Sequence, residues 1–301
     1  MIILTYRKVF FALTSLVVLA SLASIAMFGL HLSTEFTGGT LVEVRYAGER
    51  PTQQVLSTAL TEDGIEDFTV RESGTNALIV RAGQLTGEER AALPGTVSID
   101  GQYQATIERL SEIGPTIGVE LRNKSLVAIS LVLLCILLFI AFAFRKVSKP
   151  VSSWMYGLAA IVGLVHNVIV TLGFYAALGY FFGAQVDTLF VTAILTVLGF
   201  SVHDTIVVFD RVRENLKLNQ EYNRKEDFEV TAGKSLEQTF TRSVNTSLTV
   251  LISLGALFFI GPSATEDFAL TLIVGIIAGT YSSLALSTPL LVVAEKRSSD
   301  K

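Results

Sequence analysis

Long apolar runs separated by short polar stretches make up most of the chain. A helix rises 1.5 Å per residue, so about 20 apolar residues cross the roughly 30 Å hydrocarbon layer of a bilayer. Six segments approach or exceed this length, and the fifth is the shortest. The pattern predicts an α-helical polytopic membrane protein with six transmembrane helices, at residues 9–30, 125–144, 155–178, 186–209, 247–260 and 268–294.

Residues 31–124, between the first two apolar segments, show the pattern of a small soluble domain. Residues 40–46 alternate between apolar and polar positions as a half-buried strand does, and a proline at Pro51 begins a helical pattern that runs to residue 60. Two further strands are expected at 68–72 and 77–81 around a turn at Ser73–Gly74. Strand, helix, strand and strand predict a small α+β domain of ferredoxin-like type. Its interspersed charges show no catalytic or metal-ligand spacing and are typical of a solvated surface.

Composition agrees with a membrane protein and excludes several functions. Half of the residues are hydrophobic, 17% are charged, and the mean hydropathy is +0.55. The net charge of −4 gives no sign of nucleic-acid binding. Cys135 is the only cysteine, so neither an intramolecular disulfide nor a cysteine-based zinc site is possible. No phosphate loop, haem motif or zinc motif is present, so we expect no cofactor and no enzymatic active site; the energy for any work would come from an ion gradient or a partner.

The distribution of Lys and Arg predicts the orientation. Short loops near 179–185 and 261–267 contain none, whereas the opposite ends of the helices are rich in them. The positive-inside rule then places four regions in the cytoplasm: the N-terminus before the first helix, the loop after the second helix, the loop near 210–246, and the tail 295–301. The N-terminus and the first helix together make up division 1–30. The basic residues concerned are Arg7, Lys8, Arg145, Lys146, Lys149, Arg211, Arg213, Lys217, Arg224, Lys225, Lys234, Arg242, Lys296, Arg297 and Lys301.

The same rule places residues 31–124 outside the cytoplasm and leaves 125–294 as the helical bundle. The first apolar segment is longer than the core of a signal peptide and lacks a polar cleavage region, so we expect it to be an uncleaved anchor.

Asp204 is the leading candidate for a functional residue. It follows His203 within the apolar fourth segment, and a carboxylate at the middle of a membrane helix costs roughly 2.5–3.5 kcal/mol on insertion scales. Such residues usually handle charge or protons. Arg242, expected at the start of the fifth helix, is a candidate partner whose approach and withdrawal would release and load a proton. The alternatives are a hydrogen-bonded structural role for Asp204 and a simple cationic cap for Arg242.

Polar residues form stripes on three of the predicted helices, and polar faces in a membrane are expected to turn toward a bundle interior or a water-filled path. We therefore expect the stripes to meet. Alternatively, His166 and His203 simply bond to neighbouring helices, and Asp210, Arg211 and Arg213 form surface ion pairs. The stripes comprise Gly163, His166, Asn167 and Thr171; Thr192, Thr196, Gly199 and His203; and Arg242, Asn245, Thr246, Thr249 and Ser253.

Glycine-bearing motifs flank the predicted α+β domain, and small residues recur along the sixth helix. Glycine permits unusual backbone angles and close approach, so both motifs suit hinges or tight packing, although ordinary turns are the alternative. The small residues Gly275, Gly279, Ser283 and Ser287 predict close helix packing. The two motifs are Glu35, Phe36, Thr37, Gly38 and Gly39, and Gly114, Pro115, Thr116 and Gly118.

Taken together, the two glycine motifs, the block 199–215, the stretch 241–247, and Asp267-Phe-Ala with the segment 279–283 resemble the SecF family of protein-export membrane proteins. SecF is the smaller partner of SecD in the bacterial SecD–SecF complex of the RND superfamily. The resemblance implies a subunit of the bacterial plasma (inner) membrane that works with SecD beside the SecYEG channel, together with the SecA-driven translocon and YajC.

The resemblance also implies a mechanism, in which the proton-motive force draws unfolded exported polypeptides outward after the ATP-driven motor has acted. By the same resemblance, Asp204 and Arg242 are the residues expected to take part in proton passage. Three residues depart from the family pattern: Glu35 and His203 stand where Asp and Asn are usual, and Asn167 stands where an Asp follows the third-helix histidine. Half of an RND-type lipid or drug exporter, and a non-conducting scaffold of the translocon, are the alternative functions.

Overall fold

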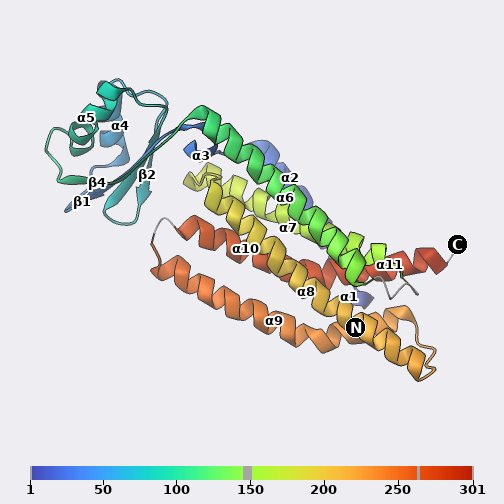
Figure 1. Ribbon diagram of the computed structural model, residues 1–301. Helices are drawn as coiled ribbons and strands as arrows, with labels where there is room; N and C mark the ends of the chain where they lie inside the picture. Colours follow the sequence, from blue (N-terminus) through green and yellow to red (C-terminus); the bar gives the residue numbers. More distant parts are fainter. Residues whose placement is uncertain (1, 145–150, 263–264, 300–301) are drawn as a thin grey trace.

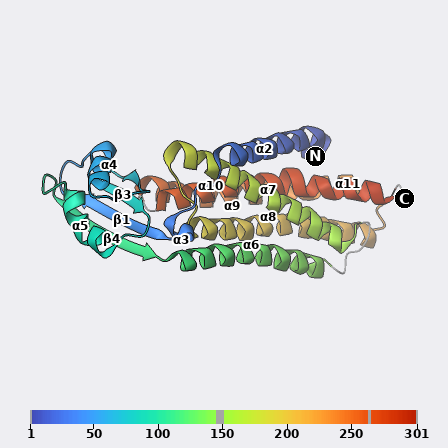
Figure 2. The same ribbon diagram turned by 90° about the horizontal axis from the view of Figure 1, so that it is seen from above.

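A computed structural model describes residues 2–144, 151–262 and 265–299. Four of the cations used to predict orientation, Arg145, Lys146, Lys149 and Lys301, lie outside the described residues. An α+β domain lies at one end of a long helical bundle, and the short helix α1 (Ile2–Thr5) and the C-terminal helix lie toward the other end (Figures 1 and 2). We call these ends the domain end and the hairpin end.

Six membrane-length helices confirm the predicted fold class. The sixth contains one turn of π-helix, η2, between two α-helical parts. The α2 and α6 helices lie on opposite sides of the bundle (Figure 2). The six are α2 (Arg7–Phe28), α6 (Pro115–Ala143), α7 (Ser153–Phe182), α8 (Thr188–Glu221), α9 (Phe228–Ile260), and the sixth formed by α10 (Glu266–Ser282), η2 (Ser283–Ser287) and α11 (Thr288–Ser299).

The segment 210–246, predicted as a loop, is almost entirely helical. The α8 helix continues to Glu221 and α9 begins at Phe228, so the two form a hairpin that projects past the other helices at the hairpin end (Figure 1). Hydropathy detects only the apolar part of a helix, and the extension is held by polar contacts instead. The prediction also placed Arg242 at the start of the fifth helix, whereas it lies near the middle of α9.

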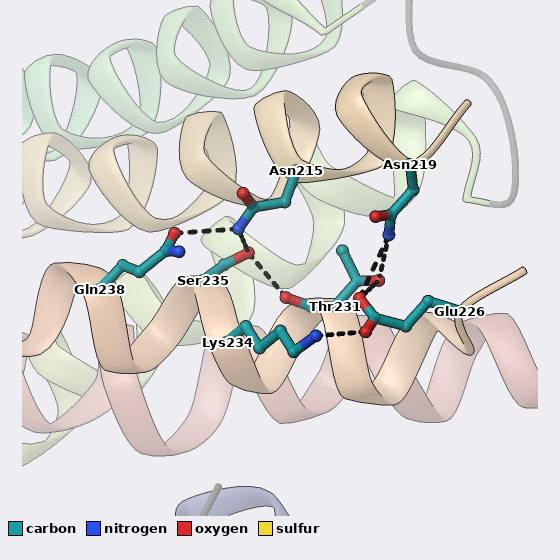
Figure 3. A network of polar contacts seen from close by, with 7 residues as sticks. All are labelled: Asn215, Asn219, Glu226, Thr231, Lys234, Ser235 and Gln238. Atoms are coloured by element: carbon teal, nitrogen blue, oxygen red, sulfur yellow. Dashed lines mark hydrogen bonds and ion pairs between the residues drawn. The ribbon is translucent and has the colours of Figure 1, made fainter. Parts of the chain in front are cut away.

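The hairpin is joined by side-chain hydrogen bonds between its two helices (Figure 3). Asn215 Nδ2 donates to Ser235 Oγ at 2.8 Å and to Gln238 Oε1 at 3.0 Å. One turn further along, Asn219 Nδ2 donates to Thr231 Oγ1 at 2.9 Å. Because both amides bridge from α8 to α9, the hairpin is a stiff extension of the bundle.

The domain between α2 and α6 has ferredoxin-like topology, as predicted. Its antiparallel sheet has the strand order β2-β3-β1-β4, and its helices α4 and α5 connect β1 to β2 and β3 to β4. The sequence analysis missed α5, which contains Pro94, and β4, which is mostly polar and lies at the sheet edge. The elements are β1 (Gly39–Tyr46), α4 (Gln53–Glu62), β2 (Thr69–Ser73), β3 (Ala77–Ala82), α5 (Gly87–Ser98) and β4 (Ala105–Ile113).

The core of the α+β domain lies between the sheet and its two helices. Alternate residues of β1 and β3, such as Val44 and Val80, are buried against Leu56 and Leu93. Tyr46 is also buried there, its hydroxyl donates to the Val97 carbonyl at 3.0 Å, and burial raises its pKa to about 12. The strand residues between these buried positions face the other side of the sheet. They include Arg71 and Arg81, which lie near the bundle.

Candidate functional site

Asp204 lies inside the bundle at the middle of α8 and is 3% exposed. Its Oδ2 atom is buried and has no hydrogen-bond partner among the described residues. The neighbouring side chains that act on the carboxyl are Ser243, His203 and Arg242. Ser243 is 1% exposed, and its hydroxyl faces the carboxyl closely enough to act on it, although among the described residues neither Ser243 Oγ nor Asp204 Oδ2 makes a well-formed hydrogen bond. A buried carboxyl with an unsatisfied oxygen is costly in any structural role, so this position has the chemistry of a site for a proton or a cation.

The structure differs from the expectation that all three polar stripes meet inside the bundle. On α9, Ser243 faces Asp204, whereas Arg242 and Asn245 are exposed. Successive residues of a helix point about 100° apart, so Ser243 and its neighbour Arg242 cannot share one face. On α8 the stripe of Thr192, Thr196, Gly199 and His203 is exposed, and the Thr196 hydroxyl returns to the carbonyl of Thr192 at 2.8 Å.

The stripe on α7 is buried and contacts α8. His166 Nδ1 lies 3.0 Å from Asn167 Oδ1, and Asn167 Nδ2 donates to Ser201 Oγ at 2.7 Å. Ser201 lies one turn before Asp204 on α8, and Thr205 Oγ1 donates to the Ser201 carbonyl at 3.0 Å. Sequence reasoning missed Ser201 and Ser243, because a single small hydroxyl in an apolar run is common in membrane helices.

Close packing joins α10 to α8 near this network. A Cβ on Gly275 would lie 2.3 Å from Val197 Cγ2, and a Cβ on Gly279 would lie 3.0 Å from Ser201 Cβ. Both positions therefore need glycine for the two backbones to approach. The π-helical turn η2 follows directly, and such turns often occur at functional sites.

The two glycine motifs pack against each other at the domain end. Gly38 has φ +83°, and a Cβ there would lie 2.7 Å from Pro115 Cα. A Cβ on Gly118 would lie 2.8 Å from the Gly38 nitrogen. Gly114 and Pro115 begin α6, and Thr116 on its first turn is exposed. The two crossings of the chain between domain and bundle therefore form one tightly packed joint.

Glu35 and Phe36 attach this joint to the bundle. Glu35 Oε2 accepts hydrogen bonds from the Thr188 backbone nitrogen at 2.9 Å and from its hydroxyl at 2.6 Å, so it caps the first turn of α8. Phe36 is 2% exposed and lies in the bundle core. Thr37 Oγ1 donates to the Ser33 carbonyl at 3.1 Å, and Gly39, at φ +132°, leads into β1.

A polar cavity of about 80 Å³ lies beside the joint, between the sheet and the bundle. Arg81 Nε and Gln185 Oε1 are buried there without a hydrogen-bond partner among the described residues. Burial lowers the pKa of Arg81 and raises that of Asp187. The charged side chains of the lining are Arg71, Glu72, Arg81, Asp187, Glu266 and Asp267.

The charges at the hairpin end of α8 form local pairs. Arg211 pairs with Glu214 at 2.9 Å, and Arg213 pairs with Asp210. The Arg213 guanidinium also lies 5.6 Å from the centre of the Phe144 ring. These exposed contacts agree with the alternative of surface ion pairs, each worth little. Within the described residues, no group of three or more His, Cys, Asp or Glu side chains could hold a metal ion.

Comparison with known proteins shows the family of the chain. The family model "Protein export membrane protein SecD/SecF, C-terminal" matches residues 97–297, and the "SecD/SecF GG Motif" model matches residues 23–48. The chain belongs to the SecF family. The SecF translocase subunits of Thermobaculum terrenum and Anaerolinea thermophila are each 40% identical to it, over 98% and 97% of this chain and 94% of each relative.

A solved relative has the same fold. The crystal structure of SecDF from Thermus thermophilus, a translocon-associated membrane protein, superposes with a TM-score of 0.84 at 32% identity. It covers 98% of this chain, which spans 38% of the SecDF chain. SecDF in its super-membrane-facing form gives a TM-score of 0.66. The family and the six helices establish a multi-pass membrane protein of the Sec translocase, with a role in protein export.

Proposed function

We propose that this chain, with SecD and beside the SecYEG channel, uses the proton-motive force to promote the late stage of protein export and membrane-protein insertion. The observation that carries the proposal is the Asp204 carboxyl, which is buried at the middle of α8 with an unpartnered oxygen. A membrane carboxyl of this kind is tolerated when it is protonated or meets a cation, and exchange between these two states would couple proton passage to helix movement.

SecD is the proposed partner because the site is incomplete within this chain. Arg242 and His203, which act on Asp204, are exposed, and so is Asn245 on α9, although polar side chains in a membrane usually face protein or water. The Thermus thermophilus protein is named SecDF, and the present chain spans 37% of it. A second six-helix chain lying on this exposed face would cover the stripe and move Arg242 relative to Asp204.

The proposed orientation places the hairpin end in the cytoplasm of a bacterium and the α+β domain outside its inner membrane. Arg7 and Lys296 both pair with Glu229 at the hairpin end, so the two chain ends share one side of the bundle. The domain division 1–30, 31–124, 125–294 and 295–301 follows from this orientation. Unfolded exported polypeptides would then meet the α+β domain as they leave the channel, and the SecA-driven translocon and YajC would act upstream.

The test measures ATP-independent release of an exported protein from spheroplasts, with and without a proton gradient. Asp204→Asn keeps the size of the side chain and removes its titration, and Glu214→Gln, on the exposed face of the same helix, is the matched control. Both are compared with wild type at equal membrane abundance and equal SecD co-purification. We expect the gradient-stimulated part of release to fall at least about tenfold in Asp204→Asn, in line with loss of a proton-transfer group, and to persist in Glu214→Gln. Unchanged release in Asp204→Asn would reject proton coupling and favour the scaffold.

A further inference from the structure

His166 is a buried histidine whose two ring nitrogens have different surroundings. The residue is 5% exposed and lies at the middle of α7. Its Nδ1 is hydrogen-bonded to Asn167 Oδ1 at 3.0 Å, whereas Nε2 is buried without a partner among the described residues. A histidine kept only for structure would be expected to satisfy both nitrogens, so the free Nε2 needs an explanation.

The neighbouring amide determines which nitrogen carries the proton. Asn167 Nδ2 donates to Ser201 Oγ, so its Oδ1 is the atom that faces the His166 ring. An amide oxygen accepts hydrogen bonds, and Nδ1 must therefore carry the hydrogen of the neutral imidazole. The lone pair is left on Nε2. Asn167 is thus a positioning residue that holds the ring and selects a tautomer with an unused proton acceptor.

The surroundings of His166 are polar but contain few titratable groups. On α10, the Tyr281 ring centre lies 6.0 Å from that of His166, and the Tyr281 hydroxyl donates to the Phe10 carbonyl of α2. On α8, the titratable group is Asp204, one turn beyond Ser201. Asp204 is therefore the only acid within one turn of the network in the described part of α8.

The π-helical turn presents a second unpartnered group to the same face of α7. Gly163 lies one turn before His166, and a Cβ there would lie 2.6 Å from Ser287 Oγ. Ser287 is fully buried, and its hydroxyl has no hydrogen-bond partner among the described residues. Unpaired donors and acceptors therefore gather where α7 meets η2, in the interior of the bundle and away from the exposed stripe of Arg242.

We infer that His166 Nε2 is a second proton-accepting site of the bundle, held ready by Asn167, whose contact with Ser201 joins the Nδ1 side of the ring to α8 one turn before Asp204. The inference rests on the proposed proton coupling. Nε2 and the Asp204 carboxyl are not in contact, so water relays the proton in the step: the O–H bond of the Asp204 carboxylic acid breaks, a water molecule accepts that proton and releases another of its own, and an Nε2–H bond forms. Asp204 becomes a carboxylate and His166 an imidazolium, so the net charge of the bundle does not change, and the reverse step restores both neutral groups.

The first test reads the proton directly. The full chain, co-purified with SecD and reconstituted in bilayers, is labelled with ¹⁵N-histidine, and the His166→Asn variant assigns the resonance among three histidines. We expect an unprotonated Nε2 at high pH that gains a proton as the pH falls, while Nδ1 remains protonated. An Nε2 that carries hydrogen at high pH, or one that never titrates between pH 5 and pH 9, would overturn the inference.

The second test separates proton transfer from packing. His166→Asn can still donate to Asn167 Oδ1 but lacks an equivalent of Nε2, and the control Ser125→Ala on α6 removes a hydroxyl that donates to the Leu121 carbonyl of its own helix. We expect gradient-stimulated release to fall at least tenfold in His166→Asn and its pH profile to lose one titration, with neither change in Ser125→Ala. Wild-type release and an unchanged profile in His166→Asn would assign the residue a structural role.

Asp204→Asn, measured in parallel, distinguishes the two proposals. If Asp204→Asn loses stimulation and His166→Asn keeps it, only the inference about His166 fails. If both variants keep it, proton coupling itself fails.

Discussion

Arg71 of β2 and Asp267 of α10 form a two-pronged ion pair between the α+β domain and the bundle, with Nη1–Oδ2 and Nη2–Oδ1 distances of 2.8 and 3.3 Å. The covalent crossings leave the sheet from β1 and β4, at the edge opposite β2 in the strand order β2-β3-β1-β4. The domain is therefore attached at both edges of its sheet, by a glycine joint on one side and by an ion pair on the other. Movement about the joint would require this pair to open.

Opening the ion pair is expected to loosen the domain without unfolding it. Both side chains are about one-third exposed, at 29% and 32%, so Arg71→Gln should cost only about 1 kcal/mol. Hydrogen exchange should rise at β2 and at the first turn of α10, while β1 and β4 keep their protection. The double charge reversal Arg71→Asp with Asp267→Arg should restore the wild-type pattern. Equal exchange in wild type and Arg71→Gln would show that the ion pair does not hold the domain against the bundle.

The glycine joint should not accept even a methyl group. Gly38→Ala places a Cβ 2.7 Å from Pro115 Cα at a positive φ, and Gly118→Ala places one 2.8 Å from the Gly38 nitrogen. Backbone atoms must shift in both cases, so we expect each variant to lose roughly 2 kcal/mol or more of stability. Thermal unfolding in detergent measures the effect. Gly48→Ala is the control because nothing lies within 4 Å of its Cβ; an equal loss in the control would refute a packing cause.

Glu35 should stabilise the start of α8. One of its carboxylate oxygens, Oε2, accepts two hydrogen bonds from Thr188, so Glu35→Ala leaves the first turn of α8 uncapped and should cost about 1–2 kcal/mol. Glu35→Gln keeps an oxygen acceptor and should cost less. The comparison is made by thermal unfolding and by hydrogen exchange at the Thr188 amide. If the two variants are equally destabilised, charge rather than capping is the important property.

Asp187 should make stability depend on pH. Burial raises its pKa above the ordinary value of 3.8, so the folded state binds the proton more tightly than the unfolded state does. Stability from this group is then greatest below pH 3.8 and decreases as pH rises through the raised pKa. Asp187→Asn should remove this slope. The asparagine side-chain oxygen can still accept the hydrogen bond from the Phe190 nitrogen, so the cap of α8 is kept. Melting temperatures from pH 4 to pH 7 test it, and an unchanged slope in the variant would assign the dependence to another group.

Some parts of the structure follow from local sequence patterns. Six apolar runs predicted six membrane helices, alternation in 40–46 predicted β1, and two strand-like runs around the turn at Ser73–Gly74 predicted β2 and β3. These elements could be predicted because each one follows from the side chains of its own segment. The polar ends of α8 and α9 were not predicted as helix, because hydropathy registers only apolar side chains. Asn215 and Asn219 stabilise these ends through hydrogen bonds to α9. The strand β4 was missed because an edge strand with polar residues has no strong alternation.

The sequence by itself determined the membrane class, the family and the ferredoxin-like character of the domain. It also made Asp204 the leading candidate for a functional residue, since a carboxylate within an apolar run is costly wherever it lies. Only the tertiary structure decided which polar residues meet. It placed Ser243 rather than Arg242 against Asp204 inside this chain, joined Asn167 to Ser201, and paired Arg71 with Asp267 across 196 positions of sequence. These partners depend on the rotation and crossing of packed helices, where a shift of one residue turns a side chain by about 100°, and no local pattern records that rotation.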